Sequence, residues 1–147
     1  MDLAAWLERL EQLHPSAIDL GLARSGEVAR RLELLDTTVT SITVAGTNGK
    51  GSTVAVMEAI LCARGERVGA FTSPHLVRYN ERIRVEGVEV SDALIVEAFE
   101  AIEKARSDIS LTYFEFNTLA ALWIFKKLDV ACQLLEVGLG GLSLIHI

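Results

Sequence analysis

The amino-acid sequence predicts an α/β fold: a P-loop-type, mostly parallel sheet flanked by helices, with a small β-hairpin. Two patterns predict this fold. Short apolar runs rich in β-branched residues alternate with segments of helical periodicity, an order typical of parallel strands covered by helices. In addition, a glycine-rich loop at 46–51 joins one apolar run directly to a helical segment. Hydrophobic residues make up 50% of the 147-residue chain, enough for a substantial core.

The chain begins with two predicted helices. Residues 2–13 are amphipathic, and Pro15 ends the pattern because proline interrupts a helix. The apolar stripe of this first helix carries Leu3, Trp6, Leu7, Leu10 and Leu13. Residues 26–35 predict a second helix. Its inward face is expected to carry Val28, Leu32 and Leu35.

A strand, a loop and a helix come next. Residues 41–45 predict the strand and residues 52–64 the helix. One side of that helix is expected to carry Val54, Met57, Ile60 and Leu61. Gly65 fits the C′ position, where a left-handed backbone conformation ends many helices. Residues 67–72 predict the next strand.

The second half of the chain continues this alternation. Residues 82–90 contain alternating apolar positions around Gly87 and predict the β-hairpin. Helices are expected at 92–106 and at about 113–128, followed by an apolar strand at 130–137. We expect this last strand to lie at an exposed edge of the sheet.

The glycine-rich loop has the chemistry of a phosphate site. Glycines let backbone N–H groups turn inward, the helix start contributes free N–H groups, and Lys50 adds a full positive charge. Such a combination binds the phosphates of a nucleotide. The general P-loop pattern has glycine and a hydroxyl residue where this chain has Val44 and Gly51. An Asn48-Gly49 hairpin turn is the alternative, although the helical pattern after it argues against a hairpin.

Further polar groups occur where the predicted strands end. Ligands of parallel sheets bind beyond the carboxyl ends of the strands, where the glycine loop, the loop at 73–75 and Glu136 all fall. Nucleotide phosphates require Mg²⁺, which prefers oxygen ligands, and Glu136 is the best carboxylate candidate. Glu136 could instead be a solvated residue, and Ser73-Pro74 alone is ordinary turn chemistry. The aromatic residues at 113–116 fit either the core or a pocket for a flat heteroaromatic ligand.

Composition excludes several classes of partner. Lys and Arg number 14 against 20 Asp and Glu, a net charge of −6 that argues against nucleic acid. No apolar run reaches transmembrane length and the N-terminus lacks a secretory pattern, so we expect no membrane association. Cys62 and Cys132 are isolated and are expected to be buried thiols in a reducing cytoplasm. No metal-ligand spacing connects His14, His75 and His146.

Several motifs occur together in a characteristic order. They are Ala-Gly-Thr-Asn-Gly-Lys-Gly-Ser at 45–52, Thr-Ser-Pro-His-Leu at 72–76, Thr-Tyr-Phe-Glu at 112–115 and Glu-Val-Gly-Leu-Gly-Gly at 136–141. Before them stand Leu-Glu-Gln-Leu-His at 10–14 and Ile-Asp-Leu-Gly-Leu at 18–22. Over residues 6–141 the chain resembles the Mur ligase superfamily, and within it the bacterial bifunctional dihydrofolate synthase/folylpolyglutamate synthase family. The resemblance implies an incomplete Mur ligase-like ATPase domain.

The resemblance implies ATP-dependent amide ligation. ATP would phosphorylate the carboxylate of dihydropteroate or the γ-carboxylate of a folate, and L-glutamate would attack the acyl phosphate. ATP would be bound, with Lys50 as the catalytic residue, by Gly46, Thr47, Asn48, Gly49, Lys50, Gly51 and Ser52. The implied Mg²⁺ ligands are Ser73 and Glu136. The implied pterin-binding residues are Gln12, Leu13, His14, Thr112, Tyr113, Phe114 and Glu115.

The end of the chain departs from the family pattern after Gly141. We interpret residues 1–141 as a partial N-terminal ATP-binding domain, residues 142–147 as a foreign tail, and the C-terminal domain as absent. The chain alone is therefore expected to be inactive, whereas the full-length protein is expected to be a monomer. Two alternatives stay open: a fragment of a Mur-type peptidoglycan ligase and a non-catalytic nucleotide-binding module. The motifs at 73–76 and 113–115 argue against the first.

Overall fold

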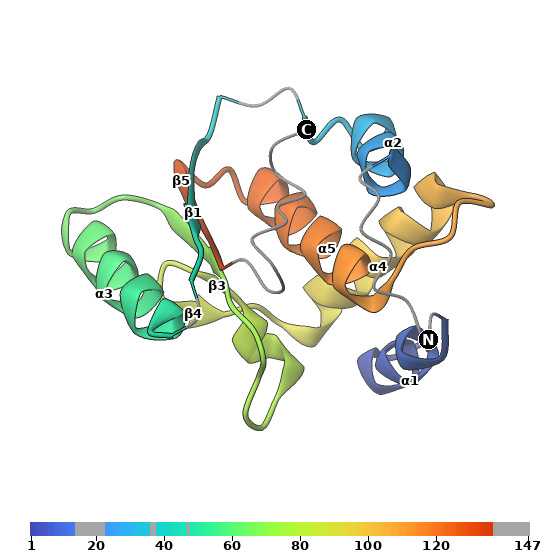
Figure 1. Ribbon diagram of the computed structural model, residues 1–147, viewed down its shortest axis with the longest axis horizontal. Coiled ribbons are helices and arrows are strands. Elements are labelled where there is room, and N and C mark those ends of the chain that lie inside the picture. The colour runs from blue at the N-terminus through green and yellow to red at the C-terminus, as the bar shows by residue number, and fades with distance from the viewer. Residues whose placement is uncertain (14–22, 36–37, 47, 137–147) are drawn as a thin grey trace. The chain divides into compact units, whose positions relative to one another are not determined.

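A computed structural model describes residues 1–13, 23–35, 38–46 and 48–136, with the side chain of Leu13 left out. These residues belong to two compact units (Figure 1). Of the described residues, 1–13, 23–35 and 92–124 form the helical unit, and 38–46, 48–91 and 125–136 form the sheet unit. Among the helices that the structure describes, none combines the length and apolar character needed to cross a membrane.

The helical unit is built around an aromatic cluster. Its helices are α1 (Leu3–Leu13), α2 (Ala23–Arg31), α4 (Asp92–Arg106) and most of α5 (Tyr113–Lys127). Trp6 of α1, Phe99 of α4 and Phe116 of α5 are buried, and the rings of Trp6 and Phe99 lie 5.7 Å apart. Phe116 contacts Phe99 edge-on at the same centroid distance of 5.7 Å. Tilted and edge-on pairs at this distance are favoured over face-to-face stacking, so the cluster joins α1, α4 and α5 into one core.

The second helix differs from the sequence prediction. It spans Ala23–Arg31 rather than 26–35, and Glu33 beyond it adopts a left-handed backbone with φ 58°. This turn ends the helical periodicity, so Leu34 is buried whereas Leu35 is 42% exposed. The expectation that Leu35 points inward was therefore wrong, because it assumed that the helix continued through the turn.

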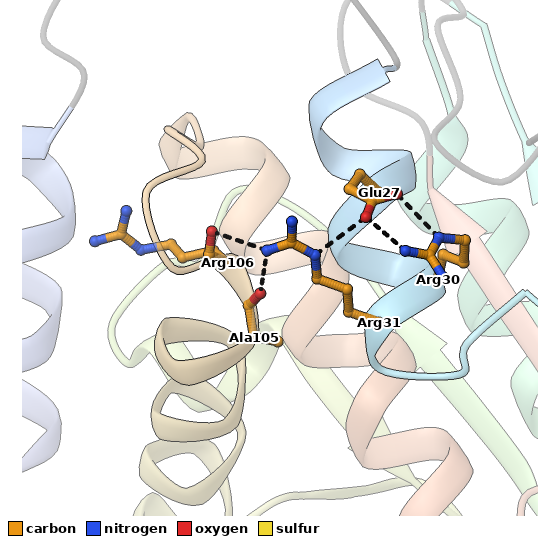
Figure 2. A network of polar contacts seen from close by, with 5 residues as sticks. All are labelled: Glu27, Arg30, Arg31, Ala105 and Arg106. Carbon is orange, nitrogen blue, oxygen red and sulfur yellow. Dashed lines mark hydrogen bonds and ion pairs between the residues drawn. The ribbon is translucent and has the colours of Figure 1, made fainter.

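Figure 2 shows how α2 is tied to the end of α4 within the helical unit. The guanidinium of Arg31 donates to the carboxylate of Glu27 at 3.1 Å and to the carbonyl oxygen of Ala105 at 2.9 Å. Arg30 binds the same carboxylate. Hydrogen bonds first from Arg30 and then from Arg31 lower the pKa of Glu27 to about 2. Arg31 also places a cation against carbonyl groups at the C-terminus of α4, the end that favours positive charge.

The sheet unit contains the mixed sheet that the sequence predicts. Its strands are β1 (Thr40–Val44), β2 (Val68–Phe71), β3 (Ile83–Val85), β4 (Val88–Glu89) and β5 (Cys132–Glu136). The spatial order is β1-β5-β2-β3-β4. Strands β1, β5 and β2 are parallel, whereas β3 and β4 are antiparallel to their neighbours. The mostly parallel sheet and the small hairpin are thus confirmed.

The position of β5 corrects the expectation of an exposed edge. β5 pairs with β1 on one side and with β2 on the other, and all its residues are buried. Among the described residues, β1 is the outer parallel strand, and Thr40 and Ser41 in it are exposed. The apolar character of β5 therefore reflects a central position, which is typical of parallel strands covered on both faces.

Helix α3 (Lys50–Ala63) packs on β1, β2 and β5 within the sheet unit (Figure 1). The buried core residues that they share are Val54, Val68, Ala70, Cys132 and Leu134. Met57 and Leu61 pack against this core as expected, but Ile60 is 54% exposed and does not. Cys62 is half-buried rather than buried, whereas Cys132 is buried as expected, and burial raises the pKa of both thiols.

Two turns have the glycine chemistry expected for them. At the end of α3, Gly65 has φ 79° and its N–H donates to the carbonyl of Cys62, while Glu66 donates to that of Leu61. These two hydrogen bonds form a Schellman motif, which confirms Gly65 at C′. In the hairpin, Glu86 and Gly87 both have positive φ values, 54° and 79°. Two such residues match the twist that joins antiparallel strands tightly.

Candidate phosphate and metal site

The glycine loop leads from β1 into the first turn of α3. Gly49 is the N-cap of α3 with φ 77°, Gly46 has φ 145°, and Lys50 is the first helical residue. The cap has no side-chain hydrogen bond. The hydroxyl of Thr53 donates to the carbonyl of Gly49 at 2.9 Å, while the side chain of Ser52 is exposed. The N–H groups of the first turn are thus available to an anion, and the helix dipole favours one there.

The space around the loop fits the approach of a phosphate group. A Cβ atom added at Gly46, Gly49 or Gly51 would meet no heavy atom within 4 Å. Asn48 and Gly49 are exposed and Lys50 is half-buried. Positive φ explains glycine at 46 and 49, and the open space leaves the backbone accessible to a ligand. The residues present therefore fit the phosphates of a nucleotide.

Strand register places Glu136 at the same end of the parallel strands as the glycine loop. Val44, the last residue of β1, pairs with Glu136, and Phe71, the last residue of β2, pairs with Leu135. The glycine loop, Glu136 and Ser73 therefore lie at the carboxyl ends of three neighbouring parallel strands, as the sequence predicts. Glu136 is 7% exposed and has no hydrogen-bond or ion-pair partner among the described residues.

The described residues contain no group of three or more His, Cys, Asp or Glu side chains suited to hold a metal. Mg²⁺ does not need such a group, because it commonly takes one or two protein oxygen ligands together with water and phosphate. A buried carboxylate beside a phosphate loop, with a serine hydroxyl on the adjacent loop, fits this donor set. The roles of Ser73 and Glu136 as ligands stay predictions.

The loop that carries Ser73 is organised by a residue that the sequence analysis missed. The carboxylate of Glu81 accepts hydrogen bonds from the backbone N–H groups of Leu76, Val77 and Arg78, at 2.9, 2.9 and 2.8 Å. These bonds, the one from Arg78 first, lower the pKa of Glu81 to about 2. Glu81 lies at the third position of the short helix η1 (Tyr79–Arg82), where an acid commonly caps backbone N–H groups. That spacing was the signal available in the sequence.

Two arginines complete the arrangement, Arg82 directly before β3 and Arg84 within it. Arg82 donates through Nε to Nδ1 of His75 at 2.8 Å, and its guanidinium lies 5.6 Å from the ring centre of Tyr79. Arg84 of β3 binds Glu58 of α3 through Nε and NH2, at 3.0 to 3.2 Å. Its NH1 group donates to the hydroxyl of Thr72 at 3.1 Å. The sequence offered no local signal for this long-range pair.

The residues expected to bind the pterin ring belong to the helical unit. Thr112 and Glu115 form a capping box at the start of α5: the N–H of Thr112 donates to Glu115 at 2.9 Å, and the N–H of Glu115 donates to the Thr112 hydroxyl at 3.1 Å. Arg24 of α2 also binds Glu115, at 2.9 Å. One carboxylate oxygen of Glu115, Oε2, is buried without a hydrogen-bond partner among the described residues.

The other predicted pterin residues have varied environments. Phe114 is 37% exposed, Tyr113 is half-buried and Gln12 is exposed. The side chain of Leu13 and all of His14 lie outside the described residues, as does Thr47 of the glycine loop. At the start of α5, Phe114 thus offers an exposed aromatic ring beside the half-buried Tyr113, whereas Thr112 and Glu115 have a structural role in capping the helix.

Comparison with known proteins identifies relatives over almost the whole chain. No family model matches it. The chain is 55% identical over 139 residues to the dihydrofolate synthase/folylpolyglutamate synthase of Escherichia coli, and 49% identical to that of Haemophilus influenzae. Each match covers 95% of this chain but only 33% and 32% of the relatives. The chain therefore spans about a third of the length of the curated relatives that it matches.

Solved structures show the same fold. The chain matches E. coli FolC in complex with DHPP and ADP with a TM-score of 0.94, at 53% identity, over 99% of this chain and 35% of that one. It matches the Yersinia pestis enzyme complexed with AMPPNP and Mn ion with a TM-score of 0.91, over 96% of this chain and 34% of that one, at 55% identity. The chain belongs to the dihydrofolate synthase/folylpolyglutamate synthase family and has a Mur ligase-like fold.

Proposed function

We propose that this chain is the nucleotide-binding part of a ligase that uses ATP to join L-glutamate to dihydropteroate and to folates. This proposal rests on one observation: the glycine loop and Glu136 lie at the carboxyl ends of the neighbouring parallel strands β1 and β5. Structures of similar proteins support the proposed ligands. The E. coli enzyme has been solved in complex with DHPP and ADP, and a bifunctional homologue with Mn, AMPPNP and L-glutamate bound.

In this proposal the sheet unit binds and orients ATP. Lys50 and the N–H groups of the first turn of α3 hold the phosphates, and Asn48 and the loop glycines shape the backbone around them. Glu136 and Ser73 ligate Mg²⁺, which offsets phosphate charge. ATP supplies the phosphoryl group that activates the substrate carboxylate. The protein contributes positioning and charge neutralisation, the main terms in phosphoryl transfer.

The helical unit would bind the pterin end of the substrate. Phe114 offers a partly exposed ring for a flat heteroaromatic ligand, and Tyr113 lies beside it in sequence. Thr112 and Glu115 would act through the start of α5, which their capping box holds in place. We assign Gln12, Leu13 and His14 to the same subsite on the resemblance alone.

We further propose that the whole protein is a cytoplasmic monomer and that residues 1–141 are part of its ATP-binding domain. Residues 142–147 are a foreign tail in this proposal. Because the relatives are about three times longer than the matched region, the chain alone should lack groups needed for turnover. Purified chain supplied with Mg²⁺, ATP, dihydropteroate and L-glutamate should form no dihydrofolate, and sustained turnover would contradict the proposal.

The test uses a joined ligase, in which residues 1–136 of this chain precede the remaining part of the E. coli relative. Lys50→Ala should abolish glutamate addition without loss of folding. Glu136→Gln keeps the shape of the side chain but removes its charge, and should raise the Mg²⁺ concentration needed for activity. Product formation is followed by chromatography, and folding by thermal melting.

Lys50→Arg is the matched control, because it keeps the charge but changes the shape of the donor. Activity near that of the unsubstituted joined ligase in Lys50→Ala would refute the phosphate role. A protein that binds ATP yet forms no product with either substrate would instead be a nucleotide-binding module.

A further inference from the structure

Arg84 occupies a junction between helix α3, which begins at the glycine loop, and the loop that carries Ser73. It lies on β3 and pairs with Ala70 of β2 in the antiparallel register. Nε and NH2 of Arg84 bind both carboxylate oxygens of Glu58, and NH1 donates to the Thr72 hydroxyl and to the carbonyl oxygen of Glu81, at 3.1 and 2.7 Å. Every nitrogen of the guanidinium is therefore in use.

The two partners of Arg84 lead to the two halves of the proposed site. Glu58 lies on α3, eight positions after its first residue Lys50, which corresponds to about 12 Å along the helix axis. Thr72 directly precedes Ser73 in the chain. Glu81, whose carbonyl Arg84 also binds, holds the next N–H groups of the same loop through its carboxylate.

The junction is shielded enough for its geometry to matter. The side chains of Arg84 and Glu58 are 21% and 11% exposed. A fork-like guanidinium on a carboxylate fixes orientation as well as distance, and the remaining NH1 group then has a defined direction toward Thr72. Two further ion pairs near the β3–β4 hairpin are longer and more exposed: Arg67 with Glu86 at 3.9 Å and Arg78 with Glu89 at 3.7 Å.

We propose that Arg84 and Glu58 are positioning residues that set Ser73 relative to the phosphate loop, so that the hydroxyl and Glu136 can share one divalent cation. This inference rests on the proposed function. Outer partners that orient metal ligands commonly change metal affinity by roughly 10- to 100-fold when they are removed. Arg84 acts through Thr72 and Glu81 and touches neither the nucleotide nor the metal.

The first experiment measures the geometry in the 147-residue chain itself. Hydrogen exchange is compared for the N–H groups of Leu76, Val77 and Arg78 in the unsubstituted chain, Arg84→Gln and Arg67→Gln. Arg84→Gln should speed exchange at these three groups, because the Glu81 carbonyl loses its anchor. Arg67→Gln should not. Unchanged exchange in Arg84→Gln would overturn the proposal.

The second experiment measures the metal in the joined ligase. Arg84→Gln should raise the Mg²⁺ concentration for half-maximal activity by roughly tenfold or more, with little change in metal-free ADP affinity. Arg84→Lys keeps one charge but cannot bridge both partners, so it should fail to restore metal affinity. The double variant Glu58→Gln/Arg84→Gln removes the buried charge left by the single substitution, which guards against misfolding.

Combining Arg84→Gln with Ser73→Ala tests whether Arg84 affects metal affinity through Ser73 or by stabilising the structure in general. If Arg84 acts through Ser73, then Arg84→Gln should add little to the metal defect of Ser73→Ala, because coupled residues are not additive. Equal losses of metal and metal-free ADP affinity, or fully additive effects with Ser73→Ala, would overturn the proposal. Lys50→Ala reports separately on the proposed function, since it addresses the phosphates and leaves the Arg84 junction intact.

Discussion

Gly49 and Gly65 allow the phosphate role of the glycine loop to be separated from backbone strain. Both have left-handed backbones with nearly equal φ, 77° and 79°, and a Cβ added to either would meet no heavy atom within 4 Å. Alanine in this conformation costs about 1–2 kcal/mol. Gly49→Ala and Gly65→Ala should therefore destabilise the chain to a similar degree, lowering its melting temperature by roughly 2–8 °C at about 2–4 °C per kcal/mol.

Nucleotide binding should distinguish the two substitutions. At Gly49 the new methyl group occupies space in front of the first turn of α3, where we place the phosphates. Loss of one hydrogen bond to a charged group costs about 1.5–3 kcal/mol. That loss corresponds to a roughly ten- to hundredfold rise in Kd. Gly65 caps the far end of the same helix, so Gly65→Ala should leave the Kd unchanged.

The assay is titration of ADP into the joined ligase carrying each substitution, with melting curves recorded on the 147-residue chain carrying the same substitutions. Equal melting temperatures and a raised Kd in Gly49→Ala alone would support a phosphate cradle. An unchanged Kd in Gly49→Ala would refute it, because glycine at this position would then serve only the backbone turn. Unequal destabilisation would refute the strain argument instead.

Three further predictions concern packing, acid stability and the pterin subsite. Gly69→Ala should destabilise the chain by about 1–3 kcal/mol in urea unfolding, since its Cβ would lie 2.5 Å from the buried ring of Phe125. Because the pKa of Glu81 is lowered to about 2, its carboxylate stabilises the fold fully above pH 4.5, and this stabilisation is lost as the pH falls toward 2. The free energy of unfolding of Glu81→Gln should therefore be lower than that of the unsubstituted chain at neutral pH, and the two values should converge in acid. Phe114→Ala should raise the KM of the joined ligase for dihydropteroate more than for ATP with little loss of stability, whereas Phe116→Ala should cost about 3–5 kcal/mol because its ring is fully buried.

Local patterns predicted the elements well where a single periodicity ran without interruption. Helix α4 begins and ends at the residues predicted, 92 and 106, and the hairpin turn lies at Gly87 as expected. The prediction failed at α2, where the left-handed turn at Glu33 shifts which leucine faces inward. A non-glycine residue with positive φ gives no clear signal in the sequence, because its conformation is imposed by the surrounding structure.

Strand order could not be predicted because it depends on contacts between distant segments. The strand predicted at 130–137 was expected at an edge, yet β5 lies between β1 and β2. Most residues at 130–137 are apolar, a composition that is also typical of a central parallel strand. The expected edge was wrong because position along the chain does not determine position in a sheet, whereas the apolar pattern of the strand itself indicates burial on both faces.

The sequence also predicted only part of the candidate site. The predicted strand ends were enough to place the glycine loop, Ser73 and Glu136 together, because parallel strands run in the same direction and their carboxyl ends meet. The motif at 112–115 did not distinguish a binding role of Thr112 and Glu115 from helix capping, since a threonine with a glutamate three residues later is also the pattern of a capping box. The structure shows that this capping role is filled, with Arg24 on the Glu115 carboxylate. In the proposed function, Thr112 and Glu115 would therefore affect substrate binding through the start of α5, by fixing the direction in which Phe114 is presented.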